Sequence, residues 1–152
     1  MPNWCKNRLR IFGPQADLAT FQQQAVGHPP WLSAEERQTC QPSPLNFHSL
    51  LPMPAELIAG QDPAAMEAWQ LAHWGTKCEA ESANLLGNFV TVLSYEFRTA
   101  WSPPLPLLKA IGSHWPTLTF RLNYEELGCG FIGLCKVVGA DCVDECFNVN
   151  GP

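Results

Sequence analysis

The sequence predicts one α+β domain that spans residues 1–152. A chain of this length suits a single domain, in which about 70% of the surface of the unfolded chain is buried on folding. Residues 118–124 alternate Leu, Phe, Leu and Tyr with polar side chains, which is the clearest strand signal in the chain. Residues 89–104 run from a strand pattern through an aromatic corner into a helical pattern. Strands and helices joined in this way are typical of an α+β fold.

The first third of the chain predicts a strand, a helix and a long connection. Residues 5–12 alternate in hydropathy as a half-buried strand does, and a Gly-Pro pair ends them. A helix is expected over about 15–26, where apolar residues recur at helical spacing. Residues 28–44 contain four prolines and predict a Pro-rich loop insertion with a short helical turn at 33–37. Residues 45–51 predict a second strand, which the following prolines stop.

The middle of the chain predicts a second helix and a pair of strands. The helix begins at Asp62-Pro63, because Asp is a good N-cap and proline fits the first helical turn, and it ends near Gly75. Residues 77–85 predict a weak strand, and Gly87-Asn88 a tight turn into the central strand. One face of that central strand is expected to carry Phe89, Leu93, Tyr95 and Phe97.

The last part of the chain predicts a helix followed by two strands. Ser102 is expected to cap a helix over 103–114, with Pro103 at its first position. Strands at about 118–125 and 131–138 follow. If the helices cover one face of the sheet, the apolar rows lie beneath them; these rows are Leu9, Ile11, Leu93, Tyr95, Phe97, Leu118, Phe120 and Leu122.

Four motifs recur in order along the chain. They are Met1-Pro2-Asn3-Trp4-Cys5-Lys6-Asn7, Trp74-Gly75-Thr76-Lys77, Thr99-Ala100-Trp101-Ser102-Pro103-Pro104 and Tyr124-Glu125-Glu126-Leu127-Gly128. Over nearly the whole chain they resemble the YubB-type ferredoxin-like domain family, whose members are found on bacterial plasmids and phages. The resemblance implies a ferredoxin-like antiparallel sheet with helices packed on one face, and it implies no iron–sulfur cluster. Two departures are Cys78, where a second tryptophan is expected, and the Pro-rich insertion. The family brings no activity with it.

Composition and cysteine usage narrow the class of protein. The net charge of −5 argues against a general nucleic-acid coat, which usually carries a basic excess. No apolar run is long enough to span a bilayer, and the opening residues do not read as a signal peptide. Seven cysteines without regular spacing indicate reduced thiols in a cytoplasmic protein rather than a secreted disulfide framework. We therefore expect a cytoplasmic protein with no membrane contact.

Two patterns suggest a cofactor or a metal, and we expect neither. Residues 128–133 match the glycine fingerprint of dinucleotide sites, but a strand rather than a helix is predicted to follow. Hairpin glycines are the simpler interpretation. Cys129, Cys135, Cys142 and Cys146 lack the close paired spacing of zinc ligands. Buried small hydrophobes and exposed thiols explain them better.

Three places hold polar or aromatic side chains that suit binding or catalysis. His73, Trp74, Thr76 and Lys77 form a polar and aromatic corner, followed by Glu79 and Glu81, that suits acid–base work. The favoured interpretation is structural: His73 caps the C-terminus of a helix and Trp74 packs in the core. Trp101 has the chemistry of a stacking platform, but the favoured interpretation is a buried indole that pins the joint between strand and helix. Tyr124 is a further candidate beside His73, Thr76 and Lys77. Its motif adds two carboxylates, Glu125 and Glu126, which point to opposite faces of a strand and so cannot share a substrate.

The alternation also predicts a basic surface on the uncovered face of the sheet. Five of the nine basic residues fall on outward rows, namely Lys6, Arg8, Arg10, Arg98 and Arg121. Glu96 and Glu125 fall on the same rows and partly neutralise them. This face is either an ordinary solvated surface or a docking site for an acidic protein or a phosphate backbone.

The leading functional hypothesis is a non-enzymatic accessory protein of a mobile genetic element that acts by protein binding. In this hypothesis the protein is a counter-defence, anti-CRISPR-like inhibitor of a host nucleic-acid-targeting complex, since such inhibition needs only surface complementarity. The partner is then a host or element-encoded protein complex, with nucleic acid as an alternative ligand of the open sheet face; the oligomeric state is left open. The alternative is a small enzyme acting on nucleic acid or nucleotides at the corner from Trp74 to Lys77.

Overall fold

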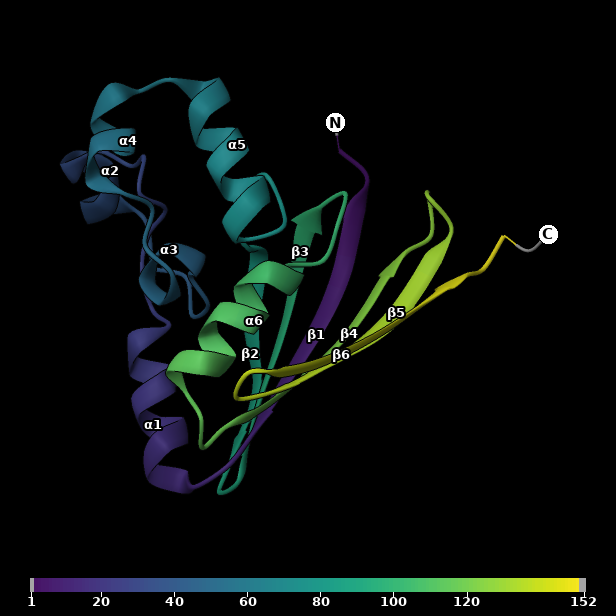
Figure 1. Cartoon of the computed structure of the whole chain (residues 1–152). Coiled ribbons are helices and arrows are strands. Elements are labelled where there is room, and N and C mark those ends of the chain that lie inside the picture. Colours follow the sequence, from purple (N-terminus) through teal and green to yellow (C-terminus); the bar gives the residue numbers. More distant parts are fainter. Residues whose placement is uncertain (1, 151–152) are drawn as a thin grey trace.

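The computed structural model describes residues 2–150, which form six strands and six helices in an α+β arrangement (Figure 1). The strands are β1 (Trp4–Phe12), β2 (Glu81–Phe89), β3 (Val92–Ala100), β4 (Thr119–Glu126), β5 (Phe131–Val138) and β6 (Asp141–Asn148). The helices are α1 (Gln15–Gln24), α2 (Ala34–Thr39), α3 (Phe47–Leu50), α4 (Ala55–Gly60), α5 (Pro63–His73) and α6 (Leu105–His114). Within residues 2–150 no helix is both long and apolar enough to cross a membrane.

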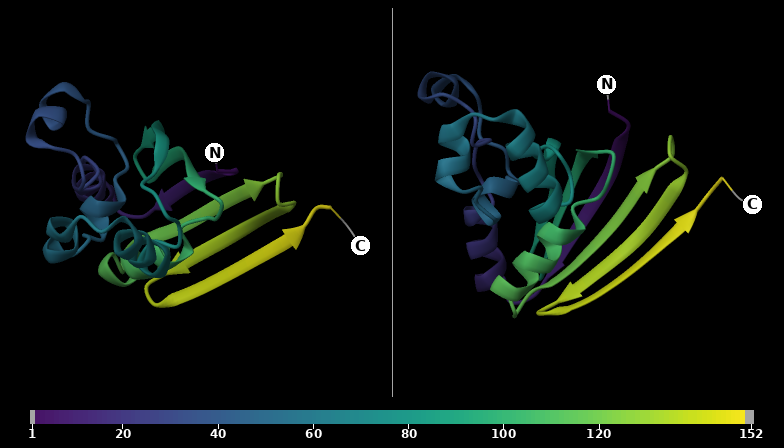
Figure 2. Two further views of the ribbon diagram at one scale, coloured as in Figure 1. Left: turned by 90° about the horizontal axis from the view of Figure 1, so that it is seen from above. Right: turned by 45° about the horizontal axis from the view of Figure 1, so that its top comes forward.

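The strands form one antiparallel sheet in the order β2-β3-β1-β4-β5-β6. The helices lie on one face of this sheet and leave the other face open (Figures 1 and 2). The cover is uneven, because β6 lies at the far side of the sheet from the layer of α1 to α5 (Figure 2). The side chains that alternate toward the helices build the core, as the sequence predicts.

The predicted apolar rows are confirmed, since all eight residues are at most 2% exposed. Aromatic rings link the sheet to the helices. Phe21 of α1 packs edge-on against Phe120, with ring centroids 5.6 Å apart, and Phe47 packs in the same manner against Phe97 at 5.9 Å and Trp74 at 5.8 Å. Such edge-to-face pairs stabilise a core beyond the burial of their area.

The Pro-rich insertion is closed at its base by a short bridge between Gly27 and Ser43. The Gly27 N–H donates to Ser43 O at 3.1 Å, and the Ser43 N–H donates to Gly27 O at 2.8 Å. The short helical turn expected here is confirmed as α2, whose N-cap Ser33 forms a capping box with Glu36.

The strand predicted at 45–51 is wrong, because this segment contains α3 instead. Asn46 caps α3 by accepting a hydrogen bond from the Ser49 N–H at 2.8 Å. The apolar residues that suggested a strand are buried as a cluster around Phe47 and Leu50. The next short helix, α4, was not predicted, since six residues are too short a stretch for a helical period to show.

The strand before the central one lies later in the chain than predicted. β2 begins at Glu81 rather than at residue 77, and the turn falls at Val90-Thr91 rather than at Gly87-Asn88. Phe89 therefore ends β2, is 71% exposed and does not share the buried face of β3. Two register irregularities in β2 displaced the alternation on which the prediction depended.

Two further boundaries differ from the prediction. α6 begins at Leu105 with Pro104 at the N-cap position, so Ser102 does not cap it; Ser102 Oγ instead donates to Gly75 O at 2.7 Å. β6 was not predicted, because most of its side chains are exposed on both faces and its sequence lacks a clean alternation.

Candidate functional site

The candidate site is the open face of the sheet, where the strand register sets the outward side chains in rows. The rows run across β3, β1, β4, β5 and β6: Arg98, Lys6, Glu125, Ile132 and Phe147; Glu96, Arg8, Asn123, Leu134 and Glu145; Ser94, Arg10, Arg121, Lys136 and Val143. Six of the nine basic residues therefore lie on this face, in a chain of net charge −5. The face concentrates the positive charge of the molecule.

One row places three cations on adjacent strands. Arg10 on β1 is directly opposite Arg121 on β4, and Arg121 is directly opposite Lys136 on β5. We call these three residues the cation row. Like charges that face each other across strands are destabilising. A bound anion is the kind of partner that would offset their repulsion.

The cation row lacks a carboxylate partner within the described chain. Among residues 2–150 the only side-chain ion pair joins Arg98 Nη2 to Glu81 Oε1 at 3.9 Å. Arg10 Nε is shielded from solvent yet has no hydrogen-bond partner there. Buried donors are normally paired, so this guanidinium is a candidate for a ligand contact.

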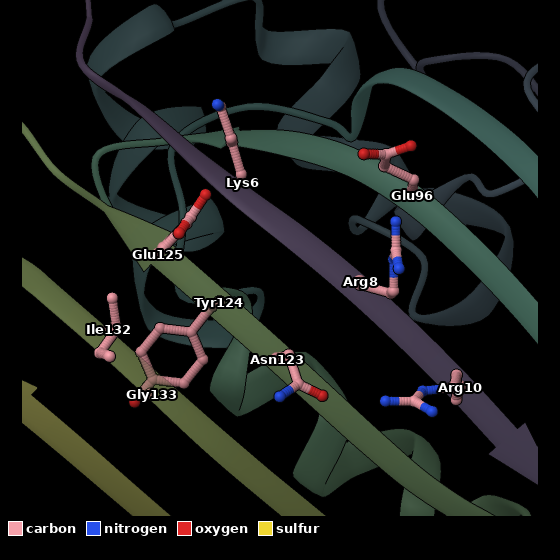
Figure 3. A pocket seen from close by; sticks show the side chains of 9 residues that line it. All are labelled: Lys6, Arg8, Arg10, Glu96, Asn123, Tyr124, Glu125, Ile132 and Gly133. Atoms are coloured by element: carbon pink, nitrogen blue, oxygen red, sulfur yellow. The ribbon is translucent and has the colours of Figure 1, made fainter.

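Beside the cation row the face is hollowed. The hollow has a volume of about 460 Å³ and crosses the middle strands (Figure 3). Its walls are formed by Lys6, Arg8, Arg10, Glu96, Asn123, Tyr124, Glu125, Ile132 and Gly133. Figure 3 shows the Arg10 guanidinium extended from β1 toward Asn123 on β4. Cations and carboxylates alternate here, which suits a ligand carrying both charges, such as a protein surface, better than a uniform polyanion.

Arg98 lies at one side of this face and is partly engaged. Its guanidinium carbon lies 5.0 Å from the centre of the Trp4 ring, and Nη2 donates to Ser82 Oγ at 3.1 Å. Because Nη2 also forms the ion pair with Glu81, Arg98 is held by contacts within the molecule. Of the five cations predicted for this face, it is the least available to a partner.

The polar corner expected near His73 holds the fold together. Trp74 is fully buried, and its Nε1–H donates to Leu51 O at 3.0 Å. Thr76 is also fully buried, and its hydroxyl donates to Ala100 O at 3.0 Å. His73 stacks on Trp69, with ring centroids 4.4 Å apart, while Lys77 is half-buried. These contacts assign packing and hydrogen bonding to the corner.

Glu79, one of the two carboxylates that follow this corner in the sequence, is buried. Its carboxylate accepts hydrogen bonds from the N–H of Phe47 at 2.6 Å and of His48 at 2.8 Å. Burial raises the pKa of Glu79 to about 7, and these backbone hydrogen bonds oppose the shift. No spacing rule signals this contact, because it joins residues 31 and 32 positions apart.

The prediction of a buried indole at Trp101 is wrong. Trp101 is 44% exposed, and its φ of +69° lies in the left-handed region that bulky residues rarely adopt. The joint is held by backbone instead, because the Trp101 N–H donates to Asn3 O at 2.9 Å. Trp101 thus lies beyond the end of β3, outside the hollow.

Tyr124 faces the helix side of β4 and is 4% exposed. Its hydroxyl donates to Asp144 Oδ1 at 2.7 Å, and burial together with Asp144 raises its pKa. It reaches the hollow only at the boundary between β4 and β5, beside Gly133. Its role within the described chain is to tie strands together.

The glycine fingerprint lies in a hairpin, as expected. Gly128 and Gly130 belong to the turn between β4 and β5, and Gly133 lies within β5, so no helix N-terminus follows. Glu126 fixes this turn by accepting from the N–H groups of Gly128 and Cys129. Within residues 2–150 no three His, Cys, Asp or Glu side chains gather as metal ligands.

Lys136 is the functional candidate that the sequence did not single out. The predicted strand at 131–138 places it outward, but nothing local shows that it lies opposite Arg121. Register between strands follows from the whole sheet, so the cation row could not be predicted from one strand.

An antiparallel sheet with helices on one face and an open opposite face defines a ferredoxin-like α+β domain. The family model described as the ferredoxin-like domain in Api92-like protein matches residues 73–148, which are half of the chain, and the protein belongs to this family. The structure is similar to the crystal structure of protein api92 from Yersinia pseudotuberculosis, with a TM-score of 0.75 and 11% sequence identity over 100% of both chains. At this identity the likeness shows the fold alone. Comparison with curated proteins gave no match.

Proposed function

We propose that the protein acts by binding rather than by turnover, and that its open face docks on an acidic surface of a protein partner. The cation row carries this proposal: three cations on adjacent strands have no carboxylate partner within residues 2–150. The hollow beside the row supplies Arg8 and Lys6 together with two carboxylates. Carboxylates of a partner over the row would form charge-assisted hydrogen bonds with its guanidinium groups.

The setting that we propose follows from the motif resemblance to the YubB-type family of plasmid and phage proteins. In that setting the protein is a cytoplasmic accessory factor of a mobile element. Its partner is a protein of a nucleic-acid-targeting defence complex, and the protein inhibits that complex by occupying it. Inhibition by occupancy needs a complementary surface and no reaction centre, which suits an open sheet face with a hollow of about 460 Å³.

The alternative, a small enzyme acting on nucleic acid or nucleotides at the Trp74–Lys77 corner, is not favoured by any contact described above. Trp74 and Thr76 are buried and already hydrogen-bonded to backbone carbonyls. Lys77 remains the side chain on which an enzymatic role would depend.

The test measures phage plating on hosts that each carry one defined nucleic-acid-targeting defence system. We expect the protein to restore plating against at least one system, and a double variant Arg10→Glu/Arg121→Glu to lose this effect while staying folded. Lys109→Glu on α6 is the matched control, because it reverses one exposed cation outside the open face. Equal activity of the double variant would reject the open face as the docking surface.

A titration against the purified defence complex separates the two classes of protein. A protein that acts by occupancy inhibits fully only at about one equivalent of the complex, whereas a catalyst acts far below it. Full inhibition at low dose that disappears in Lys77→Ala would replace binding by catalysis. Displacement of the protein by single-stranded DNA alone would assign the open face to nucleic acid instead.

A further inference from the structure

We propose that the outer edge of β6 binds an extended basic segment of another protein, which adds to the sheet as a further strand. β6 pairs with β5 along its whole length, and its other edge has no neighbour within residues 2–150. Figure 2 shows this edge at the outside of the sheet, away from the main layer of helices. An unpaired edge is a template for strand addition.

The backbone of β6 presents regularly spaced free groups. The Val149 N–H donates to Gly130 O at 2.7 Å, and a two-residue turn joins β5 to β6. Antiparallel bonding alternates along a strand, so the odd-numbered residues of β6 bond to β5. The N–H and C=O groups of the even-numbered residues therefore face outward; they belong to Cys142, Asp144, Cys146 and Asn148.

The other edge strand of the sheet, β2, is unsuited to pairing with an added strand, so strand addition is expected at β6 alone. β2 has two register irregularities, and Ser82 within it adopts a φ of +52°. Such bulges twist an edge away from pairing. By contrast, all eight residues of β6 stay in register with β5. Only one edge of this sheet is therefore suited to accept a strand.

The side chains of β6 define which strand fits. On the open face Val143 is 61% exposed and Phe147 is 56% exposed, with Glu145 between them. A strand added to this edge faces these three residues in non-hydrogen-bonded pairs, in which side chains approach most closely. The matching strand carries an apolar residue, a Lys or Arg two positions on, and a second apolar residue two positions after that.

The charge of β6 favours such a partner over a second copy of this chain. β6 carries Asp141, Asp144 and Glu145 and no basic residue. A symmetric antiparallel pair that sets Val143 against Phe147 of the second copy would also set Glu145 against its own equivalent. Like charges in that position oppose self-association, while a basic side chain there forms a cross-strand ion pair. Val143 lies opposite Lys136 of the cation row, but the added strand would bind the free backbone edge of β6, so its test does not depend on the proposed function.

The direct test uses a fluorescent peptide that contains the sequence Phe-Thr-Lys-Thr-Val, measured by anisotropy against the full chain. We expect saturable binding that weakens about tenfold when the peptide lysine is replaced by glutamate, because an attractive pair becomes a repulsive one. Hydrogen exchange should slow at the amides of Cys142, Asp144 and Cys146 when the lysine peptide is added. The amides of β2 should be unchanged.

Reversing the charge of residue 145 tests whether Glu145 determines which peptide binds. Glu145→Lys should reverse the preference and bind the glutamate peptide more tightly than the lysine peptide. Leu86→Ser on β2 is the matched control, because it removes an exposed apolar side chain from the other edge and should leave binding unchanged. Equal binding of both peptides by the native chain would overturn the proposal. So would a dimer in which the β6 amides are already protected, since a second copy would then be the occupant.

Discussion

The Tyr124 hydroxyl donates a 2.7 Å hydrogen bond to Asp144 Oδ1, and so joins β4 to β6 across the strand between them. The ring can cross β5 only because residue 133 is a glycine. A Cβ atom at Gly133 would collide with Cζ and the hydroxyl of Tyr124. This contact anchors β6, a strand whose own side chains are mostly exposed.

Gly133→Ala is therefore expected to lower the free energy of unfolding by about 1–3 kcal/mol, the usual cost of overpacking. Tyr124→Phe, which removes only the hydrogen bond, should cost about 1 kcal/mol. Both are measured by urea unfolding. The control is Gly60→Ala, where an added Cβ meets nothing within 4 Å, so stability should not fall. A Gly133→Ala variant as stable as the native protein would contradict the described path of the Tyr124 ring.

The stability of the protein should depend on the protonation of Glu79. Burial raises its pKa to about 7 in the folded state, against an ordinary value of 4.5. Between these values the folded state binds more protons than the unfolded state, so the free energy of unfolding falls as the pH rises from about 4.5 to 7. The shift corresponds to about 3 kcal/mol. Glu79→Gln, which does not titrate, should flatten this part of the profile.

His48 acts in the opposite direction and must be separated from Glu79. Its burial, and secondarily Arg37, lower the pKa of His48, so its contribution to the free energy of unfolding rises with pH as the unfolded imidazole loses its proton near 6.5. His48→Asn removes this titration, and its side-chain oxygen can replace Nδ1 as acceptor of the Met53 N–H. In that background the loss of stability between pH 5 and 7 should become steeper. A profile that rises with pH would contradict the assignment to Glu79.

Alternation predicted the centre of the sheet well, because Leu9, Phe97 and Phe120 lie in strands that bury one face and expose the other. The same rule failed at 45–51, where a short helix packs apolar residues in a cluster without any strand partner. It also failed for β6, since a strand exposed on both faces has no apolar side to alternate with. Burial on one face is what makes a strand readable from sequence.

The sequence predicted which residues of each strand lie on the open face, but not which of them lie opposite one another on neighbouring strands. Arg10 and Arg121 were each expected on the open face, and both lie there. Their direct opposition, and the addition of Lys136, depend on register across three strands. Trp101 shows the reverse case, in which a motif suggested a buried indole and a left-handed backbone leaves it exposed.

The seven thiols should divide by burial when the native protein is alkylated. Cys5 and Cys135 are fully buried, and burial raises the pKa of each to about 12, so few thiolates form at pH 8. Cys40 and Cys146 are exposed and should react first. Timed iodoacetamide labelling followed by peptide mass spectrometry measures the order. Rapid labelling of Cys5 in the folded protein would contradict its place in the core.

A separate prediction is that the C-terminal cysteines hold no stoichiometric zinc. The Cys135 and Cys142 sulfur atoms lie 3.7 Å apart, but no third ligand joins them within residues 2–150. Purified protein should contain far less than one zinc per chain by elemental analysis. One equivalent of zinc that is lost in Cys142→Ser would reverse this prediction.

The cation row should cost the free protein stability that a partner restores. In Arg121→Glu a carboxylate lies between Arg10 and Lys136, so two repulsive cross-strand pairs become attractive. We expect the free energy of unfolding to rise by about 0.5–1 kcal/mol in low salt. The gain should shrink in 1 M salt, where charges are screened beyond about 3 Å. Lys109→Glu, outside the row, should show no such salt-dependent gain. If Arg121→Glu instead destabilised the protein equally at all salt concentrations, Arg121 would contribute to packing. The cation row would then no longer be a candidate for binding a ligand.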